Sequence, residues 1–202
     1  MKPLTLRCLI LIAGICWMGC TSPVQEEAEP SATETTFDPG TLNPNAPPET
    51  AQFGQLVGIW DITDETIQSD GSWQAGEGAE WIWHYILDGH AIQDDWIAPP
   101  RYGATQSDTL RRQYGTNLRI YDPVAQRWDL ARISNTDKKL STFTATAQGD
   151  SALVMRGTHA SGNDARITFF DMTDTRFEWK LEFAQEDGSW LEVYRIHAVR
   201  RR

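Results

Sequence analysis

Residues 177–183 alternate strictly between large apolar and charged side chains, in the order Phe, Glu, Trp, Lys, Leu, Glu, Phe. Successive side chains of a β-strand point to opposite faces, so this segment would bury one face and leave the other in water. Residues 81–87 repeat the pattern more weakly, because Ile82 and Ile86 share the second face with His84. No long segment has the period of an amphipathic helix. The pattern therefore predicts an all-β protein.

Turn-forming residues divide the chain beyond residue 53 into short segments. Asp88-Gly89 and Asp187-Gly188 are examples, and their residue types tolerate or favour turn dihedrals. The strands expected between such turns lie near 55–67, 79–87, 91–97, 116–121, 127–134, 140–147, 151–159, 164–172, 176–183 and 190–199. About ten successive antiparallel strands with short connections close most simply as a single up-and-down β-barrel, which also removes exposed sheet edges.

Residues 1–19 have the character of an export signal. Lys2 and Arg7 give a basic start, residues 9–18 form an apolar run, and no acidic residue precedes Glu26. Such a start, a short apolar run and a small residue before the cut are the marks of a secretory signal peptide. The run is shorter than the roughly 20 apolar residues of a spanning helix. A cleaved signal peptide over 1–19 is therefore predicted, with an uncleaved N-terminal anchor as the alternative.

Gly19 and Cys20 resemble the bacterial lipobox, in which a small residue precedes the cysteine that is lipidated and becomes the new N-terminus. Trp17 departs from the aliphatic residue that the lipobox prefers, so an ordinary cleaved signal is the alternative. Thr21 is not the aspartate associated with inner-membrane retention. The resemblance implies an exported lipoprotein of the bacterial cell envelope. Its lipid on Cys20 would anchor it in a membrane, favouring the outer membrane on the periplasmic side.

Residues 20–52 are rich in Pro, Glu, Thr, Ser and Ala and contain almost no large apolar side chain. A segment of this composition cannot bury enough surface to offset the entropy of ordering it. Proline and repelling charges keep such a chain extended. The expected organisation is a signal peptide over 1–19, a disordered tether over 20–52 and the barrel over 53–202.

Cysteine content and charge restrict the function classes. The three cysteines are Cys8, Cys16 and Cys20, so the predicted barrel contains none. It can therefore hold no disulfide, thiolate metal site or cysteine nucleophile, and its core alone must stabilise it. The formal net charge of the chain is −10. Because a strongly acidic protein repels phosphates, nucleic acid is not an expected partner.

A Gly-x-Trp motif at Gly58-Ile59-Trp60 resembles the first strand of lipocalins and their calycin relatives. Further segments that match in order and spacing are 78–81, 86–90, 117–123, 177–179 and 187–190. Together they resemble a family of small bacterial calycin-like domains, of uncharacterised function, over about residues 53–201. The resemblance implies a barrel whose tryptophan plugs one end, and it supplies no catalytic residue.

Nitrobindin is a neighbouring family, a ten-stranded barrel that binds haem through a histidine late in the chain. His197 occupies the last expected strand and is similar in position. The nitrobindin first strand continues with further glycines after the tryptophan, whereas Asp61-Ile62-Thr63 follow Trp60 here. Because the pattern is broken, no haem and no other cofactor is expected.

The aromatic residues carry the strongest functional signal. All nine tryptophans except Trp17 lie beyond residue 53. Small-molecule sites are mostly apolar with a few polar anchors, and a ten-stranded barrel is hard to fill with its own side chains. A binding cavity for a small, largely apolar ligand is therefore predicted, against the alternative of a solid core. The expected lining residues are Trp60, Trp81, Trp83, Trp96, Trp179 and His197.

Two other functions stay open. A structural or interaction lipoprotein would have a filled barrel and an exposed apolar patch. An enzyme would use polar groups at the barrel mouth, with His90, Asp94, Asp95 and the irregular segment 98–115 as candidates. No catalytic motif and no metal-ligand spacing of the histidines is present, so neither catalytic residues nor a metal site are assigned. Asp94 and Asp95 are expected to be solvated, and the strand arginines, Arg119 among them, to face outward.

Overall fold

The structure, a computed structural model, describes residues 37–202 except 104 and 150. Its strands are β1 (Gly58–Ile67), β2 (Trp73–Ala75), β3 (Ala79–Ile86), β4 (Ala91–Ala98), β5 (Gln113–Asp122), β6 (Arg127–Ser134), β7 (Ser141–Gln148), β8 (Ala152–Thr158), β9 (Asp164–Phe170), β10 (Arg176–Ala184) and β11 (Trp190–Arg200). Two short helices, α1 (Thr50–Gly54) and α2 (Gln106–Arg111), accompany them.

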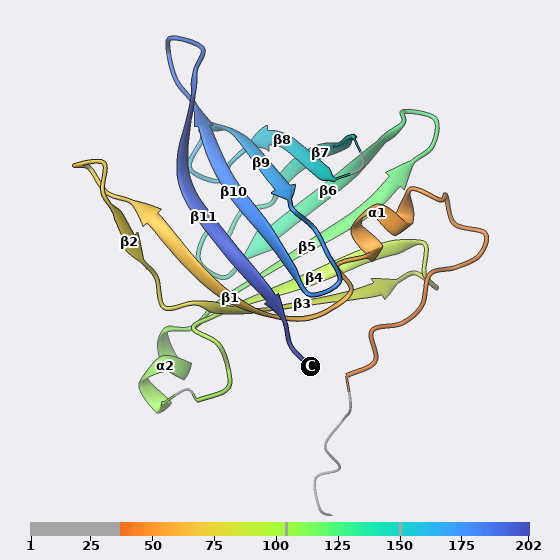
Figure 1. Ribbon diagram of the computed structural model, residues 1–202, viewed down its shortest axis with the longest axis horizontal. Helices are drawn as coiled ribbons and strands as arrows, with labels where there is room; N and C mark the ends of the chain where they lie inside the picture. The colour runs from red at the N-terminus through yellow and green to blue at the C-terminus, as the bar shows by residue number, and fades with distance from the viewer. Residues whose placement is uncertain (1–36, 104, 150) are drawn as a thin grey trace, which may run out of the picture. The chain divides into compact units, whose positions relative to one another are not determined.

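The strands form one antiparallel sheet that closes on itself (Figure 1). From β3 to β11 each strand pairs with the next in sequence, and β1 pairs with both β3 and β11. The short strand β2 pairs only with the far end of β1, beside this ring. The prediction of an all-β, up-and-down antiparallel barrel of about ten strands is confirmed.

The alternation seen in the sequence corresponds to the two faces of the barrel wall. In β10, Phe177 and Leu181 are buried in the core, while Glu178 bonds to a neighbouring strand on the outer face. The inward residues of β3 are Trp81 and Trp83, both almost fully buried. No described helix is long and apolar enough to cross a membrane.

Residues 37–52 differ from the prediction. Instead of a free tether, their first part bonds to the end of β3 and to the turn between β3 and β4, and their last residues begin α1. Pro39 O accepts a bond of 2.8 Å from Tyr85 N, and Asn43 N donates to Gly89 O at 3.2 Å. Backbone hydrogen bonds, rather than a stripe of apolar side chains, attach this segment to the barrel. Such bonds do not depend on side-chain type, so the sequence shows no apolar periodicity here. The predicted barrel start at 53 is therefore too late, and the rest of the predicted tether, with the leader and Cys20, lies outside the described residues.

Helix α1 supplies the plug of the barrel interior. Phe53 is completely buried and meets Trp128 and Phe169 edge-on, with ring centroids 4.9 and 5.5 Å apart. Gln52 Oε1 accepts a hydrogen bond of 3.0 Å from Trp128 Nε1. Because Phe53 fills the space between inward aromatic rings, the half of the barrel nearest α1 is a packed core.

Trp60 and Arg200 stabilise the same end of the barrel, where α1 leads into β1. Trp60 is fully buried and its Nε1 donates to Leu56 O at 2.7 Å. The guanidinium of Arg200 lies over the Trp60 ring, 4.2 Å from its centroid, and donates to Gln55 O at 2.7 Å. The Gly-x-Trp motif thus secures the chain entering β1 to the end of β11.

Candidate functional site

A cavity of about 410 Å³ occupies the part of the barrel interior that α1 does not fill. Its volume falls within the roughly 300–1,000 Å³ of small-molecule pockets. Its lining residues come from ten of the strands and one connecting loop: Asp64, Thr66, Trp81, Trp96, Gln113, Gly115, Asn117, Arg119, Arg132, Phe143, Met155, His159, Ile167, Phe169, Trp179, Leu181, Tyr194 and Ile196.

Aromatic rings form one wall of this cavity. The Trp81 ring lies 5.4 Å from Trp96 and 5.8 Å from Phe169, and Trp179 lies 6.4 Å from both Trp81 and Phe169. These spacings are those of edge-to-face and offset aromatic pairs. The wall therefore offers flat apolar surfaces with defined orientation to whatever enters.

A buried polar network forms another part of the lining. The Asp94 carboxylate, fully buried, accepts bonds from Trp81 Nε1 at 2.8 Å and from Asn117 Nδ2 at 2.9 Å. It also pairs with Arg119, whose side chain is 1% exposed. Arg119 lies against the Trp83 ring, 4.3 Å from its centroid. Burial lowers the pKa of the Arg119 guanidinium, and the neighbouring Asp94 charge opposes that shift.

Polar groups also line the cavity further from α1. Tyr194 donates its hydroxyl proton to Asp64 Oδ2 at 2.8 Å, and burial, reinforced by the Asp64 charge, raises the tyrosine pKa. Arg132 pairs with Asp137. His159 is half-buried, and desolvation lowers its pKa, so its imidazole is neutral at pH 7. Each charged side chain in this region therefore has a partner.

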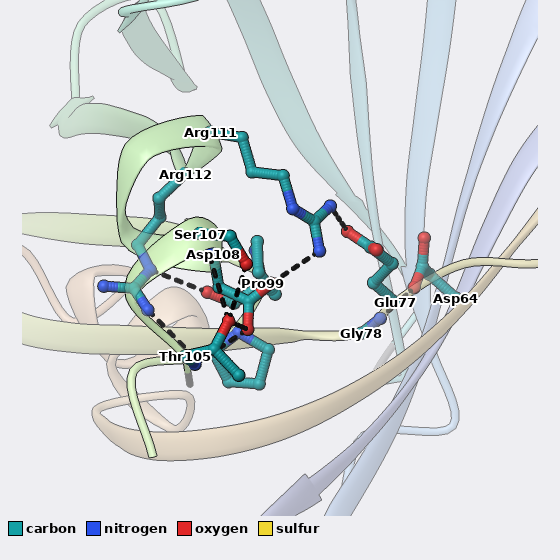
Figure 2. A network of polar contacts seen from close by, with 10 residues as sticks. Asp64, Glu77, Gly78, Pro99, Thr105, Ser107, Asp108, Arg111 and Arg112 are labelled. Atoms are coloured by element: carbon teal, nitrogen blue, oxygen red, sulfur yellow. Dashed lines mark hydrogen bonds and ion pairs between the residues drawn. The ribbon is translucent and has the colours of Figure 1, made fainter. Parts of the chain in front are cut away.

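The segment 98–112 lies beside this region and carries α2. Thr105 and Asp108 form a reciprocal capping box at the start of the helix. Arg112 Nε donates to Pro99 O at 3.0 Å, and Arg111 pairs with Glu77 in the β2–β3 connection (Figure 2). The segment predicted as an irregular stretch over 98–115 thus contains a capped helix, tied by Arg111 to the β2–β3 connection, in which Gly78 N donates to Asp64 Oδ1 at 2.9 Å.

The structure places the predicted lining residues in three groups. Trp81, Trp96 and Trp179 line the cavity. Trp60 and Trp83 point inward as expected, but they are completely buried in the packed core near α1 and do not line the cavity.

His197 differs from the prediction, because it lies on the outer face of β11. Its Nδ1 is 2.6 Å from Glu178 Oε1, and about half of the side chain is exposed. The register of β11 explains this, since Ile196 and Ala198, the neighbours of His197, face the core. The late histidine that a nitrobindin-like haem would need therefore does not reach the interior.

The candidate residues for an enzyme do not converge. Asp94 points into the barrel, Asp95 accepts a bond from Gln93 on the outer face, and His90 follows the β3–β4 turn near Asn43. In the described part of the chain, no three His, Cys, Asp or Glu side chains are grouped as a metal site would require. The barrel-mouth constellation proposed from the sequence is thus absent from residues 37–202 as described.

Sequence reasoning missed the inward polar groups of β4 and β5. Asp94, expected to be solvated, and Arg119, expected to face outward, are both buried. A signal was present, because Gly115, Asn117 and Arg119 are spaced two residues apart and share one face of β5. Only the pairing of β5 with β4 shows that this face is the inner one.

Comparison with known proteins gives the fold. No protein-family model and no curated protein matches the chain. The S-type phycobiliprotein lyase CPES from Guillardia theta matches with a TM-score of 0.53 and 13% identity over 75% of this chain and 92% of that one. Rv2717c from M. tuberculosis matches with a TM-score of 0.52 and 9% identity over 78% of this chain and all of that one. The closed barrel fits the calycin-like architecture, and these identities support the shared fold alone.

Proposed function

We propose that this protein is a binding barrel that holds a small, flat, largely apolar molecule in the cavity beside Trp81, Trp96 and Trp179. The observation that carries the proposal is the cavity itself, about 410 Å³ of space lined in part by the Trp81, Trp96 and Trp179 rings. A structural role alone gives no reason to leave that volume unfilled, since each empty cavity costs packing energy.

The charges of the lining favour an uncharged ligand. Arg119 and Arg132 each have an aspartate partner, and Asp64 adds a negative charge. The cavity therefore has no surplus positive charge to attract an anion. One of the similar structures is named as an S-type phycobiliprotein lyase, and this is consistent with a ligand-holding barrel here.

The proposal is tested by filling the cavity. Gly115 lines it, and a Cβ there would meet its nearest atom, Ser134 Cβ, at 3.6 Å, which is ordinary contact. Gly115→Phe should therefore fold and occupy the space. Leu118→Phe is the matched control, because Leu118 lies on the same strand with its side chain 45% exposed. We expect native mass spectrometry of the purified protein to detect a bound small molecule in the wild type and in Leu118→Phe but not in Gly115→Phe. Equal occupancy in all three would contradict the proposal.

We further propose that the barrel acts in the bacterial cell envelope as a lipoprotein anchored through Cys20, in the outer membrane and facing the periplasm. The support is the basic and apolar leader, the Gly19-Cys20 pair and the restriction of all cysteines to this region. Cys20→Ser should move the protein from the membrane fraction to the soluble fraction. Unchanged fractionation would contradict lipid anchoring and leave the ligand proposal untouched.

An interaction role is the second candidate, because the outer face of β5 and β6 exposes Leu118, Ile120 and Ile133, each about half accessible. This interaction role would be favoured if the mass-spectrometry experiment detected no ligand in the cavity.

A further inference from the structure

Arg119 has more hydrogen-bond donors than the protein uses. A guanidinium carries five N–H groups. Among the described residues its one hydrogen-bond partner is Asp94, reached from Nη1, and its Nε is buried with no partner at all. A buried N–H without an acceptor costs roughly 1–3 kcal/mol. The unfilled donors belong to a side chain that lines the cavity.

The surroundings hold the guanidinium in place. One face of it lies over Trp83 at 4.3 Å, with the Phe53 ring 5.0 Å away. Asp94 is itself fixed by Trp81 and Asn117. A further acceptor for the guanidinium would therefore have to reach it from the cavity that the Arg119 side chain lines.

From this arrangement we infer that the ligand presents an uncharged hydrogen-bond acceptor, of the kind a ketone, aldehyde or amide carbonyl provides, to the Arg119 guanidinium. This inference rests on the proposed function and specifies the chemical class of its ligand.

Asp94 is the reason that the acceptor is uncharged. Its carboxylate already balances the positive charge of Arg119 at 0% exposure. A ligand carboxylate beside the same guanidinium would leave one uncompensated negative charge in a dry interior, and Asp64 on the cavity lining would add to the repulsion. A carbonyl oxygen satisfies the free N–H groups without adding charge.

The aromatic wall of the cavity indicates the chemical character of the rest of the ligand. Trp81 bonds to Asp94 through its indole nitrogen and also presents its ring to the cavity, 5.8 Å from Phe169. An acceptor placed at Arg119 therefore brings the atoms bonded to it against these rings. The expected ligand class is a flat, conjugated or aromatic carbonyl compound.

Three probes with one common body test the inference: 2-acetylnaphthalene, 2-ethylnaphthalene and 2-naphthoate. They share the naphthyl group and differ in bearing a neutral acceptor, no acceptor or an anionic acceptor. Binding to the full-length protein is measured by isothermal titration calorimetry at pH 7. We expect the ketone to bind about tenfold or more tightly than the hydrocarbon, the value of one hydrogen bond to a charged donor, and more tightly than the carboxylate.

A double variant locates the effect. Arg119→Met with Asp94→Asn removes both charges together and keeps an acceptor for Trp81 and Asn117, which protects folding. It should bind ketone and hydrocarbon equally. Arg195→Met is the matched control, because Arg195 also pairs with a carboxylate, Glu65, and lies 4.0 Å from the centroid of a tryptophan, Trp73, but does not line the cavity. It should keep the preference.

The outcomes separate the two proposals. Binding of all three probes without preference for the ketone, or tightest binding of the carboxylate, would overturn the Arg119 inference and leave the apolar binding barrel standing. Failure of every probe to bind, together with absence of a co-purified molecule, would overturn both.

Discussion

Trp81 Nε1 donates a hydrogen bond of 2.8 Å to Asp94 Oδ1, so the same tryptophan that faces the cavity also fixes the buried carboxylate. The aromatic wall and the buried polar network therefore share a residue and depend on each other for their positions. A change in either should affect both the stability of the barrel and the shape of the cavity.

Asp94→Ala should destabilise the barrel strongly. It would leave the Arg119 charge buried without its counter-ion, and breaking a buried pair from one side costs about 3–5 kcal/mol. Urea unfolding followed by tryptophan fluorescence measures the change. Glu77→Gln breaks the exposed pair with Arg111 and should leave the unfolding midpoint almost unchanged. Equal effects of the two variants would argue against a special role of the buried pair.

Phe53→Ala should remove the plug of the core. The side chain is 0% exposed, and truncating such a phenylalanine costs about 3–5 kcal/mol through lost burial and the cavity left behind. Phe37→Ala serves for comparison, because Phe37 is 40% exposed. Thermal unfolding should show a large drop in midpoint for the first variant and a small one for the second. A small drop for both would mean that α1 does not contribute to the core.

Arg200→Met should loosen the junction between β1 and β11. It removes the donors to Gln55 O and Val57 O and the cation over the Trp60 ring. A loss of about 1–3 kcal/mol in unfolding free energy is expected from denaturant titration. Arg202→Met, at an exposed position, should cost nothing measurable, and a similar loss there would assign the effect to net charge.

His159 should make stability depend on pH in the mildly acid range. Burial holds its folded-state pKa below the ordinary value of 6.5, so the unfolded chain takes up the proton first as pH falls. The contribution of His159 is therefore complete above pH 6.5 and is lost as pH falls from there toward the folded pKa. Unfolding free energies measured at steps between about pH 7.5 and 5 should fall less steeply in His159→Gln. An NMR titration placing the His159 pKa above 6.5 would rule this out.

The barrel and its strands could be predicted from the sequence because they depend on local patterns. The period of two in residues 177–183 and the turns at Asp88-Gly89 and Asp187-Gly188 each act over a few residues. Helix α2 was missed, since its capping box is short and its other contacts include Glu77, which lies 34 positions before Arg111 in the chain. Residues 37–52 were missed for the same reason, because their partners are distant backbone groups.

The candidate site was predicted only in part, because strand register decides whether a side chain points into the barrel or away from it. Trp81, Trp96 and Trp179 could be chosen by residue type, but His197 was placed inside when β11 turns it outward toward Glu178. Asp94 and Arg119 are charged, and charged residues are seldom buried unless paired. Their pairing joins positions 25 apart in the sequence, so the spacing of Gly115, Asn117 and Arg119 could place these residues on one face of β5 but could not show the partner of Arg119.

The pairing of β1 with β11, called the seam below, also determines when the barrel can close. Asp64 and Tyr194, bonded across that seam, are 130 positions apart. A chain emerging from the ribosome cannot close its barrel until β11 has been synthesised, and until then β1 and the newest strand are open edges. Closure of the barrel is therefore the last strand pairing to become available as the described part of the chain is made.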